Sequence, residues 1–132
     1  MDTKVEILKK AELKGFSVEL RNDGIMQIVF KTDVIIKLED AKAMVKAFAE
    51  VGGGKKHPLL FIASNSSFVN AEGRYYAASI EANQYTAASA FVVKNIAQKL
   101  VGNAYLKINK PITPTRIVTS EEDGVLWLKT FL

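Results

Sequence analysis

Cysteine is absent from this sequence of 132 residues, and histidine occurs once, as His57. Without cysteine, the chain can form no disulfide, thiolate metal site or cysteine nucleophile. His57 lies in a short turn between Lys55 and Pro58, where the sequence shows no orienting partner for a catalytic imidazole, so we interpret it as a solvent-exposed turn residue. Because nucleophile–base pairs, carboxylate pairs and metal-ligand motifs are all missing, we predict a protein that is not an enzyme and uses no cofactor.

Long apolar runs and an excess of one charge are also missing. No run approaches the roughly 20 residues that a membrane helix requires, so we expect no membrane insertion. The net charge is +4, from 18 basic and 14 acidic side chains, and no basic motif is interleaved with aromatic residues, which argues against a nucleic-acid partner. The first 15 residues contain acids and no apolar block, unlike a secretory signal, so we expect a cytoplasmic protein.

The most informative stretch lies near the middle of the chain. Leu59–Ala63 is a continuous apolar run, typical of a strand buried on both faces in the middle of a sheet. The run ends in the small polar residues Ser64–Ser67, and a short helix is predicted over Ala71–Ala78, with Asn70 as its N-cap. Functional crevices in open α/β sheets lie beyond the carboxyl ends of the strands, so Ser64–Arg74 is the candidate site.

Residues before this stretch alternate between apolar and polar side chains, which indicates half-buried strands. Strands are predicted over Phe16–Leu20 and Ile25–Phe30, joined by a tight turn at Asn22–Gly24. A short third strand over Val34–Ile36 completes an antiparallel meander. Glu39–Val51 carries an apolar stripe at helical spacing and predicts the first helix.

Strands and helices alternate in the second half of the chain. Thr86–Val93 predicts a second buried strand, whose small residues would let a helix pack closely, and Thr115–Thr119 predicts a last strand. A helix between them has a polar face and an apolar face, the latter made by Val93, Ile96, Ala97, Leu100, Val101, Ala104 and Ile108. Thr119 and Glu122 read as a capping box for a terminal helix. Its inward residues are expected to be Val125, Leu128, Phe131 and Leu132.

The predicted element order is therefore βββαβαβαβα. Strand–helix alternation requires parallel pairing through right-handed crossovers, whereas the opening meander is antiparallel. We predict an α/β fold with a mixed sheet of about five strands and helices packed on it. Residues 15–132 are expected to form a single domain. Segment 1–14 fits a short helix and an additional strand equally well and is treated as an N-terminal appendage.

Three motifs give the sequence a family resemblance. The motifs are Leu38–Lys42, Glu72–Ala77, and Gly102–Pro111 together with Pro114–Arg116. They are similar to those of a bacterial STAS-like (SpoIIAA-like) family of uncharacterised function, and the element order resembles the STAS domain of anti-sigma-factor antagonists. The resemblance spans about Phe16 to Leu132 and implies a SpoIIAA-like fold.

The resemblance also assigns a regulatory loop to this chain. In true antagonists the loop after the central strand reads like Asp-Ser-Ser-Gly, and a partner kinase phosphorylates its first serine. Phe68–Gly73 matches that loop and retains its glycine. Asn70, Ala71 and Glu72 replace the aspartate and the two serines. Because alanine has no hydroxyl group, this position cannot accept a phosphoryl group.

The resemblance implies a regulatory module that binds a protein partner through this loop, and a homodimer is also plausible because twofold dimers are the commonest oligomers. The alternative is a binder of a small lipid or an anionic metabolite, in a crevice at the carboxyl ends of the central strands. The candidate partner- or ligand-binding residues are Ser66, Ser67, Asn70, Ala71, Glu72, Gly73, Arg74, Tyr75 and Lys94.

Basic residues without acids mark the stretch from position 94 to 116. Two interpretations stay open: an anion-attracting surface near the candidate loop, or a solvated helix face followed by a loop. The basic residues are Lys94, Lys99, Lys107, Lys110 and Arg116.

Overall fold

The computed structural model describes residues 4–132, which form a main sheet of six strands and a separate two-stranded sheet. The strands are β1 (Ile7–Glu12), β2 (Phe16–Arg21), β3 (Met26–Phe30), β4 (Ile35–Ile36), β5 (His57–Ile62), β6 (Phe68–Val69), β7 (Thr86–Val92) and β8 (Thr115–Val118). The helices are α1 (Leu38–Gly52), α2 (Ala71–Ala77), α3 (Ile96–Ala104) and α4 (Glu121–Leu128), with a π-helical turn over Tyr105–Asn109 and a 3-10 turn over Lys129–Phe131.

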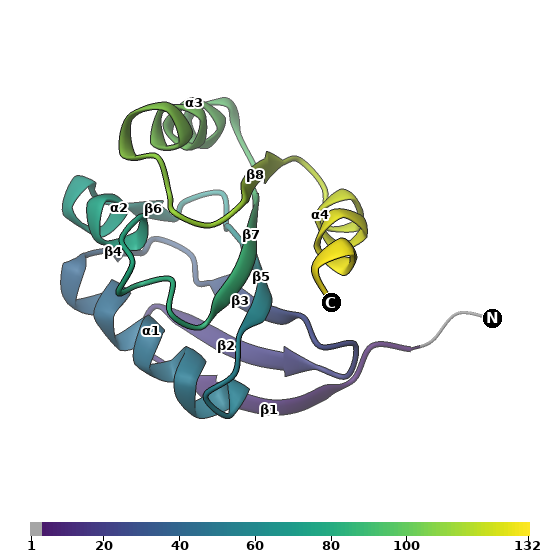
Figure 1. Cartoon of the computed structure of the whole chain (residues 1–132). Coiled ribbons are helices and arrows are strands. Elements are labelled where there is room, and N and C mark those ends of the chain that lie inside the picture. The colour runs from purple at the N-terminus through teal and green to yellow at the C-terminus, as the bar shows by residue number, and fades with distance from the viewer. Residues whose placement is uncertain (1–3) are drawn as a thin grey trace.

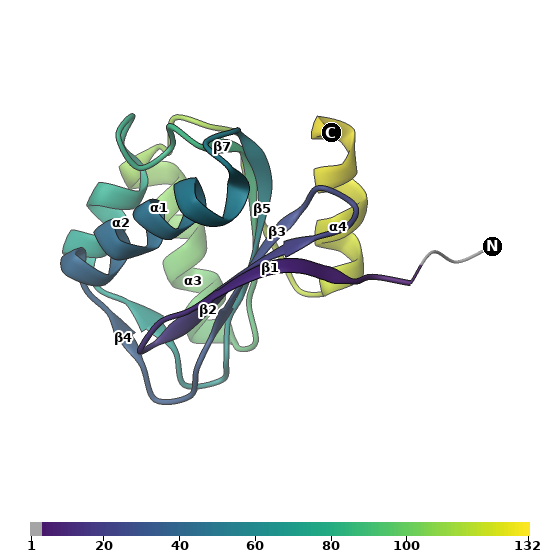
Figure 2. The ribbon, with the colours of Figure 1, turned by 90° about the horizontal axis from the view of Figure 1, so that it is seen from below.

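The main sheet separates two layers of helices. Helices α1, α2 and α3 lie on one side of it and α4 lies on the other (Figures 1 and 2). Its strand order is β1-β2-β3-β5-β7-β8, with antiparallel pairing from β1 to β3 and parallel pairing from β3 to β8. The predicted mixed α/β fold is therefore confirmed, with β5 in the interior of the sheet as expected for its apolar sequence. No helix over residues 4–132 has the length and apolarity to cross a bilayer.

The N-terminal meander differs from its prediction in one strand. Of the two alternatives left open for the first segment, residues 7–12 form the additional strand, β1, which pairs with β2; residues 1–3 lie outside the described residues. The predicted third strand, β4, does not join the meander but pairs in parallel with β6. The chain turns away from the sheet at Asp33, whose φ is 55°. The edge of β3 that faces away from β2 thereby pairs with β5. The apolar residues of β5 gain more burial from a central position in the sheet.

His57 is not the exposed turn residue that the sequence predicted. It begins β5 and is half-buried, with Nδ1 3.0 Å from the carbonyl oxygen of Gly24 and Nε2 3.0 Å from that of Gly52. A side chain at Gly52 would collide with this ring, because an added Cβ would lie 2.8 Å from its Cδ2. The imidazole therefore connects the β2–β3 turn to the end of α1.

Two hydrophobic cores form on the two faces of the sheet. Along β5, Leu59 and Phe61 belong to the core under α1, whereas Leu60 packs in the core under α4. On the α4 side the elements approach closely, because an added Cβ at Gly124 would lie 2.9 Å from Leu60 Cδ1 and 3.5 Å from Ala90 Cβ. The small residues predicted to admit a helix onto β7 do so here.

The two C-terminal helices depart from their predicted details. Ser120 rather than Thr119 caps α4, since its Oγ accepts from the backbone N–H of Asp123 at 3.1 Å. Leu132, expected to point inward, is 63% exposed. Of the predicted apolar face, Ile96 and Leu100 in α3 and Ile108 in the π-helical turn are exposed, contrary to the burial expected of an amphipathic helix, whereas Val101 is half-buried.

Candidate functional site

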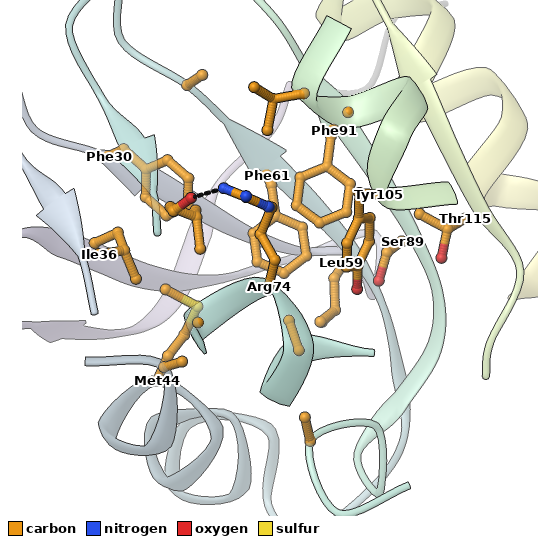
Figure 3. A pocket seen from close by; sticks show the side chains of 18 of the residues that line it. Phe30, Ile36, Met44, Leu59, Phe61, Arg74, Ser89, Phe91, Tyr105 and Thr115 are labelled. Carbon is orange, nitrogen blue, oxygen red and sulfur yellow. Dashed lines mark hydrogen bonds between the residues drawn. The ribbon is translucent and has the colours of Figure 1, made fainter. Parts of the chain in front are cut away.

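An apolar cavity of about 150 Å³ lies between the main sheet and the three helices α1, α2 and α3 (Figure 3). Its walls include Phe61 from β5, Phe91 from β7 and Met44 from α1. Helix α2 contributes Arg74, and the π-helical turn after α3 contributes Tyr105. The cavity therefore lies next to the loops that follow β5 and β7, in the region where the sequence placed a crevice.

The aromatic wall of the cavity comes from paired positions in neighbouring strands. Phe61 and Phe91 are register partners in the β5–β7 pair. Their rings stack with centroids 4.4 Å apart and an interplanar angle of 9°. Tyr105 meets Phe91 edge-on, with centroids 6.0 Å apart. Stacked and edge-on pairs are favourable ring geometries, so these side chains form a defined flat surface.

The π-helical turn positions Tyr105 on this surface. Such turns are rare and occur often at functional sites. Tyr105 is buried, and burial raises the pKa of its phenol above the ordinary value. The hydroxyl group is therefore neutral near pH 7 and is able to donate a hydrogen bond. Ser89, a buried residue of β7, supplies a second hydroxyl to the cavity lining.

Arg74 is the cationic group of the cavity. Its side chain is half-buried and extends from α2 toward the aromatic residues (Figure 3). The guanidinium lies 5.5 Å from the ring centroid of Phe68 and donates one hydrogen bond to the carbonyl oxygen of Val69. Within residues 4–132, no carboxylate forms an ion pair with it. A cation that is partly removed from water benefits from an anion, which the described part of the chain does not supply here.

The loop after β5 is fastened to the start of α3. The side-chain amide of Gln98 donates to the carbonyl oxygens of Ser64 at 2.7 Å and of Ser67 at 3.0 Å. The hydroxyl of Ser67 accepts from the N–H of Ser64 at 2.9 Å. The hydroxyl of Ser66 accepts from the N–H of Asp33 at 2.7 Å. Both predicted serine hydroxyls thus contribute to holding the loop in place.

The structure brings some predicted site residues to the cavity and leaves others outside it. Ser67, Gly73 and Arg74 line the cavity. Exposed positions lie outside its lining and comprise Ser66, Ala71, Glu72, Tyr75 and Lys94. Lys94 instead borders a shallow depression at the start of α3, with Lys99 and Thr119.

Asn70 and Gly73 have structural roles at the start of α2. Asn70 caps the helix, as predicted, because its Oδ1 accepts from the N–H of Gly73 at 2.8 Å. An added Cβ at Gly73 would lie 3.2 Å from the carbonyl oxygen of Ile36. The backbone of β4 therefore approaches this glycine closely.

Sequence reasoning missed the aromatic residues and Ser89. The signal for Phe61 and Phe91 was available, because each occupies a central position in one of two consecutive apolar strands. No sequence signal marks Tyr105, whose orientation depends on the π-helical turn. Among residues 4–132, no cluster of three or more His, Asp and Glu side chains is arranged to hold a metal ion.

Comparison with known proteins gives a family and a fold. The sequence model of a family described as "Domain of unknown function (DUF7793)" matches residues 18–132. No curated protein matches the chain. A crystal structure of an uncharacterized protein from the DUF3478 family, with a SpoIIAA-like fold, from Shewanella loihica PV-4 is similar with a TM-score of 0.60 and 11% identity, over 89% of this chain and 97% of that one. At this identity the likeness concerns the fold alone, which is SpoIIAA-like.

A second solved structure is much less similar. It is a protein with unknown function from Arthrobacter sp. FB24, with a TM-score of 0.30 and 21% identity, over 84% of this chain and 96% of that one. A TM-score this low supports no argument about the present chain.

Proposed function

For this chain, which belongs to the family described as Domain of unknown function (DUF7793), we propose the binding of a small amphipathic anion in the cavity, without chemical turnover. The observation that carries the proposal is Arg74, a cation that lines an apolar cavity and has no carboxylate partner among residues 4–132. Ligand sites are commonly apolar pockets with a few polar groups that fix orientation. The chain has this combination on one face of its sheet.

Each part of the proposed ligand has a counterpart in the cavity. An apolar or aromatic body packs against the stacked rings of Phe61 and Phe91. A carboxylate receives charge-assisted hydrogen bonds from the remaining N–H groups of Arg74. The neutral hydroxyl of Tyr105 and that of Ser89 are further donors in the lining. The ligand class is therefore a carboxylic acid with a compact apolar body.

The volume restricts the size of the ligand. An engineered apolar cavity of about 150 Å³ in another protein binds benzene, whereas drug-sized ligands occupy roughly 300–1,000 Å³. The present cavity, at about 150 Å³, suits one aromatic ring or a short aliphatic chain. A long acyl chain requires α3 to move away from the sheet.

Protein binding through residues 70–75 is a second candidate function. One observation favours it: Tyr75 is 78% exposed, beside the exposed Glu72. Exposed tyrosine is a common anchor in protein interfaces. Arg74 supports this role less well, because its guanidinium is half-buried over Phe68 and bonded to Val69.

The ligand proposal is tested by titration with benzoate and hexanoate, followed by NMR chemical shifts and calorimetry. Benzyl alcohol and hexanol are the neutral counterparts. We expect saturable binding of the acids with shifts at Phe61, Phe91 and Tyr105. Arg74→Gln should weaken acid binding by about 10- to 100-fold, the range for a hydrogen bond to a charged group. Arg116→Gln is the matched control, because Arg116 stacks on Trp127 and lies outside the cavity lining.

Two results would contradict this function. Equal affinity for the acids and the alcohols would show that Arg74 does not recognise the carboxylate. Acid binding that Arg116→Gln weakens as much as Arg74→Gln would place the ligand elsewhere. Circular dichroism of each variant separates lost binding from lost folding.

A further inference from the structure

Helix α3 presents an apolar face to solvent. Ile96, Leu100 and Ile108 are 77%, 65% and 78% exposed, and Ala97 and Ala104 between them are also exposed. Residues four apart lie on one side of an α-helix, so Ile96, Leu100 and Ala104 form a continuous strip along α3, and Ile108 follows it in the π-helical turn. A single exposed apolar residue is ordinary, but a continuous apolar strip indicates an interaction surface.

The opposite face of α3 explains this orientation. The residues that turn toward the sheet are Gln98, Val101, Gly102 and Tyr105, all of which line the cavity. Gln98 is held by its two hydrogen bonds to the loop after β5. Gly102 lets the helix approach β8, because an added Cβ there would lie 2.8 Å from Ile117 Cδ1. These contacts fix the helix with its larger apolar residues outward.

Basic residues surround the apolar strip. Lys99 and Lys107 are exposed and directly precede Leu100 and Ile108 in the sequence. Lys94 lies just before α3, and Lys110 follows the π-helical turn. Between positions 94 and 120 the sequence has no acid. The acids nearest in sequence are Glu81, in the segment between α2 and β7, and Glu121, at the start of α4.

From these features we propose that the outward face of α3 binds the surface of an anionic lipid bilayer. An amphipathic helix with exposed apolar residues and lysines lies in the plane of the interface, with the apolar side chains among the acyl chains and the lysines at the headgroups. A second copy of the chain is a poorer occupant, because a twofold contact would bring two lysine-rich strips together. Binding of this kind is peripheral and involves no spanning segment.

The proposal does not depend on an occupied cavity. The residues that line the cavity and those that face the bilayer lie on different sides of α3. Vesicle binding by the ligand-free protein therefore tests this surface alone, and Arg74→Gln should bind vesicles like the wild type.

Vesicle flotation is the experiment, with phosphatidylglycerol–phosphatidylcholine vesicles compared with pure phosphatidylcholine. We expect binding to the anionic vesicles that weakens with added salt. Neutralising Lys99 and Lys107 to glutamine should reduce binding by about 25-fold, since each lysine near an anionic surface contributes about fivefold. The matched control neutralises Lys55 and Lys56, exposed residues between α1 and β5, and should change binding little.

A second pair of variants tests the apolar strip. Leu100→Gln should reduce vesicle binding at least tenfold. Leu126→Gln is its control, because Leu126 is 63% exposed, close to the 65% of Leu100, but belongs to α4 on the other side of the sheet. Equal losses from the two substitutions would overturn the proposal.

Three further outcomes would also overturn it. They are absence of binding to anionic vesicles, equal binding to both vesicle types, and binding that depends on the lysines but not on Leu100. In the last case polyglutamate should bind to the lysine-rich face as well as the vesicles do, which would indicate an acidic protein partner. Concentration-dependent dimers abolished by Leu100→Gln, without vesicle binding, would instead assign the face to a second copy.

Discussion

On the α4 face of the main sheet, small residues bring helix and strands into contact, whereas on the opposite face large aromatic rings border a cavity. Gly124 and Ala90 meet on the α4 face, where their small size lets α4 pack directly against β7. Phe61 and Phe91 stack on the second face beside about 150 Å³ of unfilled volume. Close packing on one face thus supports a fold that carries an unfilled cavity on the other.

Truncating adjacent leucines should show this difference most clearly. Leu59 and Leu60 are neighbours in β5 with equal burial, but Leu59 lines the cavity and Leu60 packs under α4. We expect Leu60→Ala to lower the free energy of unfolding by about 4 kcal/mol and Leu59→Ala by about 2–3 kcal/mol, because fewer packed atoms surround Leu59. Urea unfolding measures both. Equal losses would contradict the asymmetry.

Enlarging adjacent residues of β7 should give effects of opposite sign. Ser89 faces the cavity, and Ala90 faces α4. Ser89→Leu should stabilise the protein by about 1 kcal/mol and prevent acid binding, because it fills the cavity. Ala90→Leu should destabilise it by about 1–3 kcal/mol through overpacking. Thermal unfolding and the benzoate titration test both, and destabilisation by Ser89→Leu would show that the volume is not available.

Alkaline pH should weaken the cavity face specifically. Burial raises the folded-state pKa of Tyr105 above its ordinary value of 10.0, so the neutral phenol is the form that the fold favours. Its contribution is complete below pH 10 and is lost as the pH rises above the unfolded pKa. We expect wild type to lose roughly 1.4 kcal/mol per pH unit more than Tyr105→Phe above that point. Urea unfolding from pH 8.5 to 11 measures the difference, and parallel curves would contradict it.

The smallest expected effect concerns the rim of the cavity. Gly73→Ala places a Cβ 3.2 Å from the carbonyl oxygen of Ile36. Although alanine favours helices by about 1 kcal/mol over glycine, we expect a net loss of about 0.5–1 kcal/mol, because the β4–β6 pair must shift. Asn103→Ala, at an exposed position of α3, is the control and should be neutral or slightly stabilising. Stabilisation by Gly73→Ala would show that the backbone yields without cost.

The sequence predicted the positions of the strands and helices better than it predicted how they pair and pack. Apolar runs and helical spacing located β5, β7 and α1, since periodicity and burial are local properties. The pairing of β4 with β6 was not predictable in this way, because Ile35 and Phe68 are brought together by the chain between them. The register that stacks Phe61 on Phe91 likewise depends on parallel pairing across α2.

Helix α3 shows why a periodic pattern can predict a helix and still misplace its buried face. Of the seven apolar residues predicted to form the inner side, Val93 and Val101 line the cavity, whereas Ile96, Leu100 and Ile108 are exposed. The polar side chain of Gln98 and the missing side chain of Gly102 determine the observed orientation instead. The prediction of the candidate site was limited in the same way. A loop motif placed Arg74 among the candidate residues, but the cavity arises from the shapes of side chains on several elements.

The division of the main sheet into an antiparallel and a parallel half also sets an order of assembly. Strands β1 to β3 occupy residues 7–30 and are joined by short turns, so their pairing closes small loops. Pairing of β3 with β5 must close a loop through α1, which is entropically slower. We therefore expect the meander to fold first and to serve as the template on which β5, β7 and β8 add. Pulse-labelled hydrogen exchange should then protect amides of β2 and β3 before those of β7 and β8.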